Sequence, residues 1–537
     1  MPLPRDAATH DVVIVGGGHN ALVAAAYLAG AGHRVVVLER LGHVGGAAVS
    51  EEPWSGVAAR LSRYSYLVSL LPRTIIDDLQ LRIELRRRRY SSYTPSPADP
   101  SRGILVDRGD ADATARSFAR ATGDPGEAAR FGVYGDRLLP LARQVFPTMT
   151  EPLRHRTEVR RLVGDDELWT DVVDRPLGEM LRRSLGSDLA RGIALTDGLI
   201  GTFATADDLS LAQNRCFLYH VIGGGTGDWD VPVGGMGQVS GELARAARTA
   251  GAEIRTGAEV VAVDPDGEVT VESADGLRDT LRGRLVLMGA GPAVLADLLR
   301  AGGVPDARAG TDDAGRAPEG AQVKVNMLLR RLPRLHDDTV SAEAAFSGTF
   351  HINETMTQLD RAHAVATAGS VPDPLPAEIY CHSLTDPSIL GPQLRAEGAQ
   401  TLTLFGLQVP HRLVAGRDAG AARAEVLAAA LASLNAVLAD AIEDCLYLAP
   451  DGSPCVEVRT TADLEQSLRM VGGDIFHGGL AWPWADDDAD LSSPATRWGV
   501  ATDHERILLC GSGARRGGAV SGIGGHNAAM AARELLG

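Results

Sequence analysis

The sequence predicts an α/β fold in which a Rossmann-like dinucleotide-binding domain is interleaved with an α+β domain. Three observations support this prediction. A strand, a glycine-rich turn, a helix and a second strand follow one another within residues 11–40. Strands and glycine-rich helix starts return in residues 234–292 and again in 506–537. The chain has 537 residues, more than a single hydrophobic core usually supports, so two domains are expected.

The first unit has the pattern and size of a βαβ motif. The run "DVVIV" (11–15) is rich in β-branched residues and suits a strand that is buried on both faces. The segment "ALVAAAYLAGAG" (21–32) follows as a helix that ends near its glycines, and "RVVVLE" (34–39) is the next strand. A unit of roughly thirty residues has the usual length for this motif.

Dinucleotide-type segments lie at the start, middle and end of the chain, so we expect the two domains to be interleaved rather than consecutive. Residues 53–221 are predicted to be mostly helical, with a turn at "YTPSPADP". The first domain is predicted to comprise residues 1–75, 226–310 and 471–537, and the second residues 76–225 and 311–470.

Composition narrows the classes of function. The formal net charge is −17, and such a surface repels nucleic acid, so we predict no nucleic-acid partner. No signal-peptide pattern and no apolar stretch of about 18 residues occurs, which favours a cytoplasmic protein without integral membrane contact. The five cysteines include no Cys-x-x-Cys pair, which argues against a redox dithiol and a thiolate zinc site, and no metal site is predicted.

The turn after the first strand carries a nucleotide-binding motif. Gly16 permits the tight turn, Gly18 lets the backbone approach a pyrophosphate, and Ala21 occupies the helix-packing position. Backbone N–H groups at the start of the helix then face the phosphates. Glu39, at the end of the second strand, is placed to accept hydrogen bonds from ribose hydroxyls. Both NAD and FAD use this arrangement, so the motif alone does not choose between them.

Three further features favour FAD over NAD. Gly45 and Gly46 allow a second approach of the backbone to a longer pyrophosphate ligand. Val260 lies on a predicted strand that can meet the adenine through backbone atoms. The segment "CGSGARRGGAVSGIGGHNAA" supplies a second glycine-rich helix start, whose positive end suits a reduced flavin ring. The residues predicted to bind FAD are Gly16, Gly18, His19, Asn20, Ala21, Glu39, Arg40, Gly45, Gly46, Ala47, Val260, Gly511, Ser512, Gly518, Gly522, Ile523 and Asn527.

Motifs along nearly the whole chain resemble those of the phytoene desaturase-like flavoproteins, and most closely the branch named pyridine nucleotide-disulphide oxidoreductase domain-containing. They include "GGGHNALVAAAYLAGAGHRVVVLER", "GHVGGAAVSEE", "YSYLVSLL", "LYHVIGG", "VGGMGQVSGELARAA", "KVNMLLRRLP" and "LLCGSGARRGGAVSGIGGHNAA". The resemblance implies a GxGxxG FAD-binding domain interleaved with an α+β substrate-binding domain. The chain departs from many relatives at Gly511 and Ser512, where they have Gly-Asp, and it lacks the cysteine pair that disulphide chemistry requires.

Lys324 is the sharpest candidate for a catalytic residue. It is the only lysine in the chain and lies on the predicted strand "AQVKVNMLL". In the related flavin amine oxidases, a lysine at a similar strand position approaches flavin N5 through a water. The resemblance therefore implies a role for Lys324 beside the flavin, whereas the alternative is a lysine on the surface of a strand.

Further candidates are histidines and tryptophans near the predicted flavin segments. His220 and His526 are predicted as catalytic residues, with packing and helix capping as the alternatives. His477, Trp482 and Trp484 are predicted to bind substrate as the wall of an apolar channel, with core packing as the alternative.

The leading functional hypothesis is an FAD-dependent oxidoreductase, a dehydrogenase or desaturase, that takes a hydride from an organic, largely apolar small molecule to flavin N5. An alternative is a flavin oxidase that acts on an amine or C–N bond in specialised metabolism with O2 as acceptor, which Lys324 favours. A flavin-bearing protein that acts only in interactions is a third hypothesis. The expected partners are a small-molecule substrate and O2 or another electron acceptor, and a homo-oligomer is compatible with the sequence.

Overall fold

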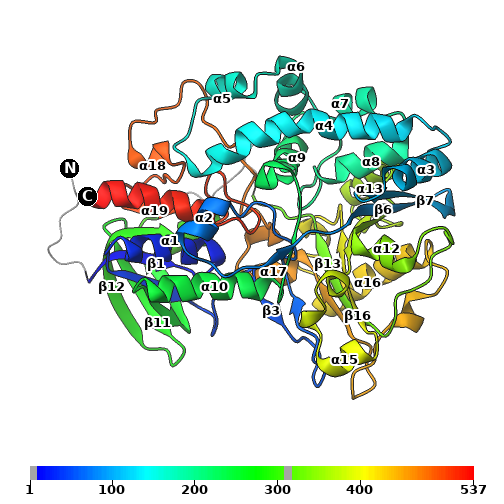
Figure 1. Cartoon of the computed structure of the whole chain (residues 1–537). Coiled ribbons are helices and arrows are strands. Elements are labelled where there is room, and N and C mark those ends of the chain that lie inside the picture. The colour runs from blue at the N-terminus through cyan, green and yellow to red at the C-terminus, as the bar shows by residue number, and fades with distance from the viewer. Residues whose placement is uncertain (1–8, 308–316) are drawn as a thin grey trace.

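Two seven-stranded sheets, each built from distant parts of the chain, organise the protein (Figure 1). The computed structural model describes residues 9–307 and 317–537. In the first sheet the strands lie in the order β10-β11-β12-β1-β2-β9, and β18 also pairs with β12. Its strands are β1 (His10–Val15), β2 (Val35–Glu39), β9 (Glu253–Thr256), β10 (Ala258–Val263), β11 (Glu268–Ser273), β12 (Arg278–Met288) and β18 (Ile507–Leu509).

Strand β1 lies at the centre of the first sheet, parallel to β12 on one side and to β2 on the other. Val12 and Ile14 pack toward the helices α1 (His19–Gly30), α10 (Met236–Thr249) and α19 (Ile523–Leu536). Val13 and Val15 pack toward α11 (Pro292–Ala301) and the β10–β11 hairpin. The strand is therefore covered on both faces, as its β-branched sequence predicts.

The second sheet is mostly antiparallel and has the strand order β17-β13-β16-β15-β14-β6-β7. Helices α12 (Ala342–Ser347) and α16 (Ala419–Asn435) pack against it around a separate apolar cluster. The strands are β6 (Tyr90–Ser96), β7 (Asp99–Asp107), β13 (Val323–Leu329), β14 (Thr349–Ile352), β15 (Ala377–Tyr380), β16 (Gln400–Gly406) and β17 (Val456–Arg459). Strands of the second sheet thus come from residues 90–107 and 323–459, while the exact domain boundaries remain a prediction.

A layer of helices lies above the second sheet in the view of Figure 1. Its members are α3 (Ala111–Thr122), α4 (Glu127–Val145), α5 (Arg156–Val163), α6 (Asp166–Trp169), α7 (Leu177–Ser184), α8 (Asp188–Thr196) and α9 (Ala212–Val221). Residues 111–221 are mostly helical as predicted, whereas residues 53–110 are largely irregular or extended and include the β6–β7 hairpin. Only Pro97 and Ala98 form the turn of "YTPSPADP"; Tyr93 and Pro95 lie in β6 because the hairpin extends the sheet through β14.

Shorter elements connect these layers. They are β3 (Ser50–Glu51), β4 (Leu61–Ser62), α2 (Arg73–Asp78), β5 (Leu85–Arg86), β8 (Val231–Pro232), α13 (Met356–Thr367), α14 (His382–Thr385), α15 (Pro392–Ala396), α17 (Thr461–Leu468) and α18 (Pro494–Arg497). Across residues 9–307 and 317–537, none of the helices combines the length and apolar character needed to cross a lipid bilayer. All five cysteines are buried and free.

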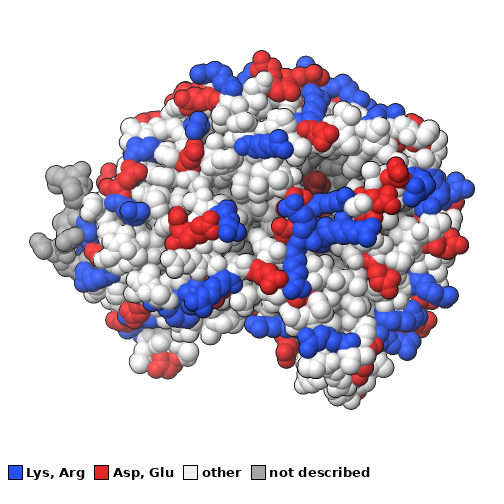
Figure 2. Space-filling view, viewed as in Figure 1, with Lys and Arg blue, Asp and Glu red and all other residues white. Residues whose placement is uncertain are grey.

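Basic and acidic side chains are interspersed on the face shown in Figure 2. Arg87 and Arg108 both pair with Asp228, at 2.9 and 2.8 Å, and Arg89 pairs with Asp107 at 2.9 Å. Arg87, Arg89 and Arg108 are therefore each paired with a neighbouring carboxylate. The absence of a nucleic-acid partner stays a prediction.

Gly525 sets the closest approach of α19 to α1, because a Cβ at this position would lie 1.8 Å from the carbonyl oxygen of Asn20. We expect Gly525→Ala to lower the free energy of unfolding by about 1–3 kcal/mol, since the two helices must separate to make room for the methyl group. Denaturant titration of both proteins measures this difference.

Gly241→Ala in α10 is the matched control, because a Cβ there meets no described atom within 4 Å. This variant should keep the wild-type stability or exceed it by up to about 1 kcal/mol, as alanine is the better helix former. Equal losses in the two variants would contradict the proposed packing constraint.

Candidate functional site

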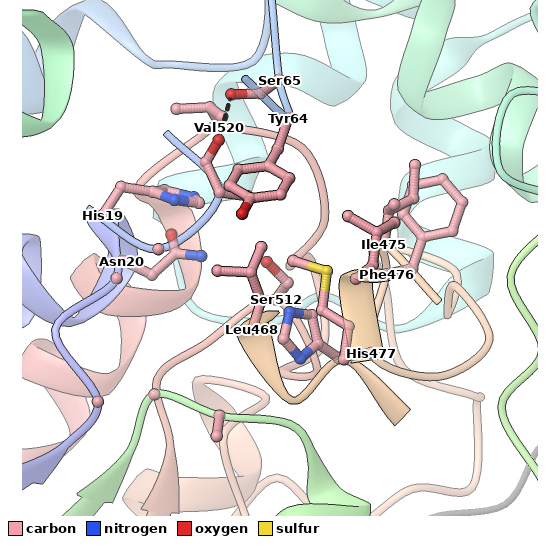
Figure 3. Close-up of a pocket in the computed structure, with 18 of the residues that line it drawn as sticks. His19, Asn20, Tyr64, Ser65, Leu468, Ile475, Phe476, His477, Ser512 and Val520 are labelled. Atoms are coloured by element: carbon pink, nitrogen blue, oxygen red, sulfur yellow. Dashed lines mark hydrogen bonds between the residues drawn. The ribbon is translucent and has the colours of Figure 1, made fainter. Parts of the chain in front are cut away.

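A cavity lies between the two sheets and extends from the β1–α1 turn to strands β13 and β16. Connecting segments at 64–67 and 475–477 close its sides, and Figure 3 shows His19 and Asn20 across from His477. Fifteen of the sequence-predicted residues line it: Gly16, Gly18, His19, Asn20, Ala21, Glu39, Arg40, Gly46, Ala47, His220, Val260, Lys324, His477, Ser512 and Gly518.

The start of α1 leaves its backbone open toward the cavity. Gly16 has a φ of +90°, which favours glycine, and its N–H donates to the carbonyl of Leu38 at 2.8 Å. A Cβ on Gly18 would meet none of the described atoms within 4 Å. Gly18 is the N-cap of α1 and supplies no side-chain hydrogen bond, so the first N–H groups of the helix are accessible to an anionic ligand.

Glu39 holds the turn in place from the end of β2. Its Oε2 accepts a hydrogen bond from the Gly17 N–H at 2.7 Å, and its Oε1 accepts one from the Leu41 N–H at 2.8 Å. Each carboxylate oxygen retains acceptor capacity, and the residue lines the cavity. Glu39 therefore shapes the turn, and its contact with a ribose hydroxyl stays a prediction.

The residues at this end of the cavity fit FAD. The Asn20 side chain is buried and lines the cavity, and its Oδ1 has no hydrogen-bond partner among the described residues. Gly45 forms a parallel bridge with Gly18, and its N–H donates to the Gly17 carbonyl at 2.8 Å. An unpartnered buried amide beside an open helix start requires a polar ligand, and the two adjoining glycine turns suit an extended dinucleotide.

Lys324 lies at the opposite end of the cavity, on β13. Its ammonium donates to the carbonyls of Ser62 at 2.7 Å and Tyr64 at 3.1 Å, and the residue is only 5% exposed. Burial lowers the pKa of Lys324 to about 7. The alternative of a surface strand lysine is therefore wrong, and Lys324 lines the same cavity as the nucleotide motif.

Aromatic side chains surround Lys324. Its Nζ lies 4.9 Å from the ring centre of Phe405 and 6.0 Å from that of Tyr66. His220 stacks on Trp229 with ring centres 5.1 Å apart, and its Nδ1 lies 2.9 Å from the Cys216 carbonyl. Sequence reasoning missed these three aromatic residues, Tyr66, Trp229 and Phe405. The motif "YSYLVSLL" contains Tyr66 and was a signal for that residue alone.

Two further histidines in the cavity wall are neutral at physiological pH. Burial lowers the pKa of His19 to about 4 and that of His477 to about 4. His19 is held by a contact of 3.2 Å between its Nε2 and the Ala519 carbonyl. These side chains therefore provide polar but uncharged groups beside the predicted flavin segment.

His526, which is predicted to be catalytic, lies outside the cavity lining. Its ring makes edge contacts with Tyr27 and Trp498, at centre distances of 5.2 and 6.1 Å, and its Nδ1 lies 2.9 Å from Asn527 Oδ1. The first turn of α19 presents His526 to α1 instead of the cavity. Asn527 donates to the Met149 carbonyl at 3.1 Å and is likewise absent from the cavity lining.

The two tryptophans predicted to form the wall of a substrate channel, Trp482 and Trp484, do not line the cavity. Trp484 is buried with its ring centre 4.8 Å from that of Trp169, and Trp482 stacks on Trp484 at 5.2 Å. Trp484 belongs to the core of the helical layer and Trp482 packs against it, and their contact with substrate stays a prediction. Five of the residues predicted to bind FAD do not line the cavity: Gly45, Gly511, Gly522, Ile523 and Asn527.

Comparisons with known proteins agree with a nucleotide-binding unit at the start of the chain and a flavin-dependent domain after it. Residues 14–74 match the NAD(P)-binding Rossmann-like domain, and residues 134–361 match the flavin containing amine oxidoreductase family. The uncharacterized protein Rv0897c of Mycobacterium tuberculosis is 54% identical over 98% of this chain and 97% of its own length. The mouse pyridine nucleotide-disulfide oxidoreductase domain-containing protein 2 is 29% identical over 97% of this chain and 92% of its own length.

Residues 134–361 of the chain thus resemble the flavin containing amine oxidoreductase family. Among solved structures, wild-type putrescine oxidase has a TM-score of 0.53 at 17% identity, and cyclohexylamine oxidase from Brevibacterium oxydans one of 0.54 at 15%; each comparison covers 98% of both chains. These likenesses confirm the predicted fold. The protein is an FAD-dependent oxidoreductase, and FAD is its cofactor.

Because the pKa of Lys324 is lowered, we expect the free energy of unfolding to depend on pH. Its pKa is lowered from 10.5 to about 7 in the folded protein, so the unfolded state binds more protons between these values. The part of the unfolding free energy that depends on the protonation of Lys324 is therefore fully present above pH 10.5, and it is lost as the pH falls toward about 7. From pH 7 to about 9.5, the wild type should gain roughly 3 kcal/mol of unfolding free energy relative to Lys324→Met.

Denaturant titrations of both proteins at each pH measure this gain. The variant also loses the hydrogen bonds to Ser62 and Tyr64, but that loss is the same at every pH. A difference between the proteins that stays constant with pH would therefore contradict a buried lysine that titrates near neutrality.

The variant Glu39→Gln tests whether Glu39 supports FAD binding by holding the β1–α1 turn in place. The amide can replace only one of the two carboxylate acceptors for Gly17 and Leu41, so the turn should loosen. We expect the dissociation constant of FAD to rise about tenfold, equivalent to about 1.4 kcal/mol. Flavin fluorescence during titration of the apoprotein measures it. Glu253→Gln, a half-exposed acid on the neighbouring strand β9, is the control and should bind FAD as the wild type does.

Proposed function

We propose that this FAD-dependent oxidoreductase takes a hydride from a carbon atom of an uncharged, largely apolar organic molecule. The observation that carries the proposal is the character of the cavity wall around Lys324. Tyr66, Trp229 and Phe405 supply aromatic surface there, and His220 and Lys324 supply the polar atoms.

The distribution of charge in the cavity favours an uncharged substrate. Among the described lining residues, the acids are Glu39 and Glu259, and both belong to the first sheet, at the nucleotide end. A cationic substrate beside Lys324 would meet no lining carboxylate in that part and would be repelled by the ammonium when it is charged. A neutral molecule instead gains from burial against the aromatic rings.

The chain's own residues position and shield the reaction. FAD, when bound, accepts the hydride at N5. The open start of α1 and the two glycine turns hold the dinucleotide, and Glu39 keeps the first turn in shape. Lys324 ties segment 62–64 to β13, which fixes the wall at the substrate end. The neutral His19 and His477 leave little charge to attract water, so the cavity favours transfer between apolar partners.

Oxidation of an amine with O2 as acceptor is the second candidate. The family match and the names of the two neighbours, putrescine oxidase and cyclohexylamine oxidase, support it. Because its pKa is about 7, Lys324 exchanges a proton near neutral pH and suits chemistry in which an amine must be present as the free base. A simple monoamine with an apolar ring fits the aromatic wall better than a diamine does.

Anaerobic mixing of the holoenzyme with matched compounds tests the proposal. The panel contains uncharged apolar alkenes and alcohols, their carboxylate and quaternary ammonium analogues, and apolar amines. We expect loss of the oxidised-flavin absorbance with uncharged members and at least about tenfold slower reduction with their permanently charged analogues. Preference for a permanently charged analogue would overturn the proposal.

The same panel separates the remaining hypotheses. With amines, reduction that accelerates as the pH rises and consumption of O2 afterwards support the amine oxidase. Reoxidation only by another acceptor supports a dehydrogenase. A flavin that no compound in the panel reduces, although chemical reductants reduce it, favours a protein that acts only in interactions.

A further inference from the structure

A chain of hydrogen bonds leaves the cavity at Tyr66 and enters the second sheet. The Tyr66 hydroxyl donates to the Tyr380 hydroxyl at 3.0 Å, and the Tyr380 hydroxyl donates to the Glu378 carboxylate. Tyr66 lines the cavity beside Lys324, whereas Tyr380 and Glu378 are buried on β15. A continuous donor–acceptor path therefore connects the proposed substrate end to a buried acid.

The path ends at a second buried group of polar side chains. β14 pairs with β15 so that His351 lies directly opposite Glu378. His351 Nδ1 lies 2.6 Å from Glu354 Oε2, which also accepts a hydrogen bond from Thr196 at 3.0 Å. Ligand-type atoms of His351, Glu354 and Glu378 all lie within 4.8 Å of one another. Oε1 of Glu354 has no hydrogen-bond partner within the described part of the chain.

Acidic groups outnumber their counter-charges in this buried region. Burial raises the pKa of Glu378 to about 8 and also raises the pKa of Asp197. Burial opposes protonation of His351, but the Glu354 carboxylate outweighs it and raises the pKa of His351. The titratable and charged groups that face the path are Tyr66, Arg88, Asp197, His220, Lys324, His351, Glu354, Tyr380 and His382.

We propose that Tyr66 and Tyr380 relay a proton from the substrate end of the cavity to Glu378, which lies in the buried cluster with His351 and Glu354. This role rests on the proposed function, because oxidation by hydride transfer releases a proton as well as a hydride. The electron pair leaves with the hydride to FAD. The proton leaves an X–H bond of the substrate, where X is nitrogen, oxygen or carbon.

Atoms and charges balance along the relay. Above about pH 8, where Glu378 is a carboxylate, the substrate proton forms a bond to the Tyr66 oxygen while the Tyr66 proton moves to the Tyr380 oxygen, and the Tyr380 proton moves to Glu378. Both tyrosines end neutral, and Glu378 ends as a carboxylic acid beside His351. The transfers are concerted, since burial raises the pKa of Tyr66 and of Tyr380 well above 10.0 and disfavours a free phenolate.

Hydrogen-bond geometry favours protons over a metal ion as the occupant of the cluster. His351 Nδ1 and Glu354 Oε2 already lie at hydrogen-bond distance, and Glu378 is engaged by Tyr380. A metal would have to break these bonds to use the same atoms. Elemental analysis of the purified holoenzyme tests this directly: an equivalent of bound metal that disappears in Glu354→Gln would overturn the relay.

Photochemical reduction of the holoenzyme tests the relay without any substrate, so its outcome is independent of the proposed function. Reduction of FAD places negative charge in the cavity, which raises the pKa of a coupled acid. Above about pH 8, Glu378 begins ionised and should therefore take up a proton. A pH indicator in weak buffer should show up to about one more proton per flavin in the wild type than in Glu378→Gln near pH 9, and no difference near pH 6.

Tyr93→Phe is the matched control for the loss of a buried hydroxyl–carboxylate bond. Tyr93 donates to Asp337 at 3.2 Å in the same sheet but does not line the cavity. This variant should match the wild type in proton uptake. Equal uptake by the wild type and Glu378→Gln at every pH would overturn the relay.

Tyr66→Phe decides the question if Glu378→Gln fails to fold or to hold FAD. The change removes one hydroxyl from the cavity wall and keeps the acid, so proton uptake at equilibrium should be preserved. After laser-flash reduction, the uptake should lag behind flavin reduction by a factor of about ten or more. Simultaneous uptake and flavin reduction in Tyr66→Phe would overturn the role of Tyr66 as the entrance to the relay.

Discussion

The close contact between the first and the last long helix determines where the cavity can form. At Gly525 the backbone of α19 meets the Asn20 carbonyl of α1, and a single methyl group would not fit between them. The contact places the first turns of α1 and α19 side by side, and the 3.2 Å contact from His19 to the Ala519 carbonyl joins the start of α1 to the loop that precedes α19. Segments about 500 residues apart in sequence thus form one wall, which an isolated βαβ unit cannot provide.

The opposite wall depends on one buried cation. Lys324 donates to the carbonyls of Ser62 and Tyr64, so β13 of the second sheet is tied to the segment that carries Tyr66. A neutral side chain of the same length would leave both carbonyls without this donor. Because its pKa is lowered only to about 7, the same group both fixes the wall and changes charge near neutral pH. Position and charge of the substrate end are therefore linked.

Local sequence was sufficient for the nucleotide end and insufficient for the substrate end. The spacing of Gly16, Gly18 and Glu39 within one βαβ unit predicts how these residues meet, because strand, turn and helix are neighbours in sequence. Tyr66, in a connecting segment, and Phe405, on β16, meet only through tertiary packing between segments more than 300 residues apart, which no local pattern encodes. The prediction for His526 rests on the glycine-rich helix start, which is visible in the sequence, whereas the face that α19 turns toward α1 is not.

Burying the carboxyl groups of Glu378 and Glu354 beside the second sheet costs free energy, and the proposed relay gives this cost a function. An ionised carboxylate without a cation is costly in a protein interior, and a structural role alone is met as well by amides, which carry no charge. Glu378 and Glu354 instead face one histidine across β14 and β15, so the group gains stability by holding protons. Two tyrosines without an acid would have no acceptor, and an acid without the tyrosines would have no path from the cavity. Their continuous arrangement is what couples a buried charge to oxidation at the flavin.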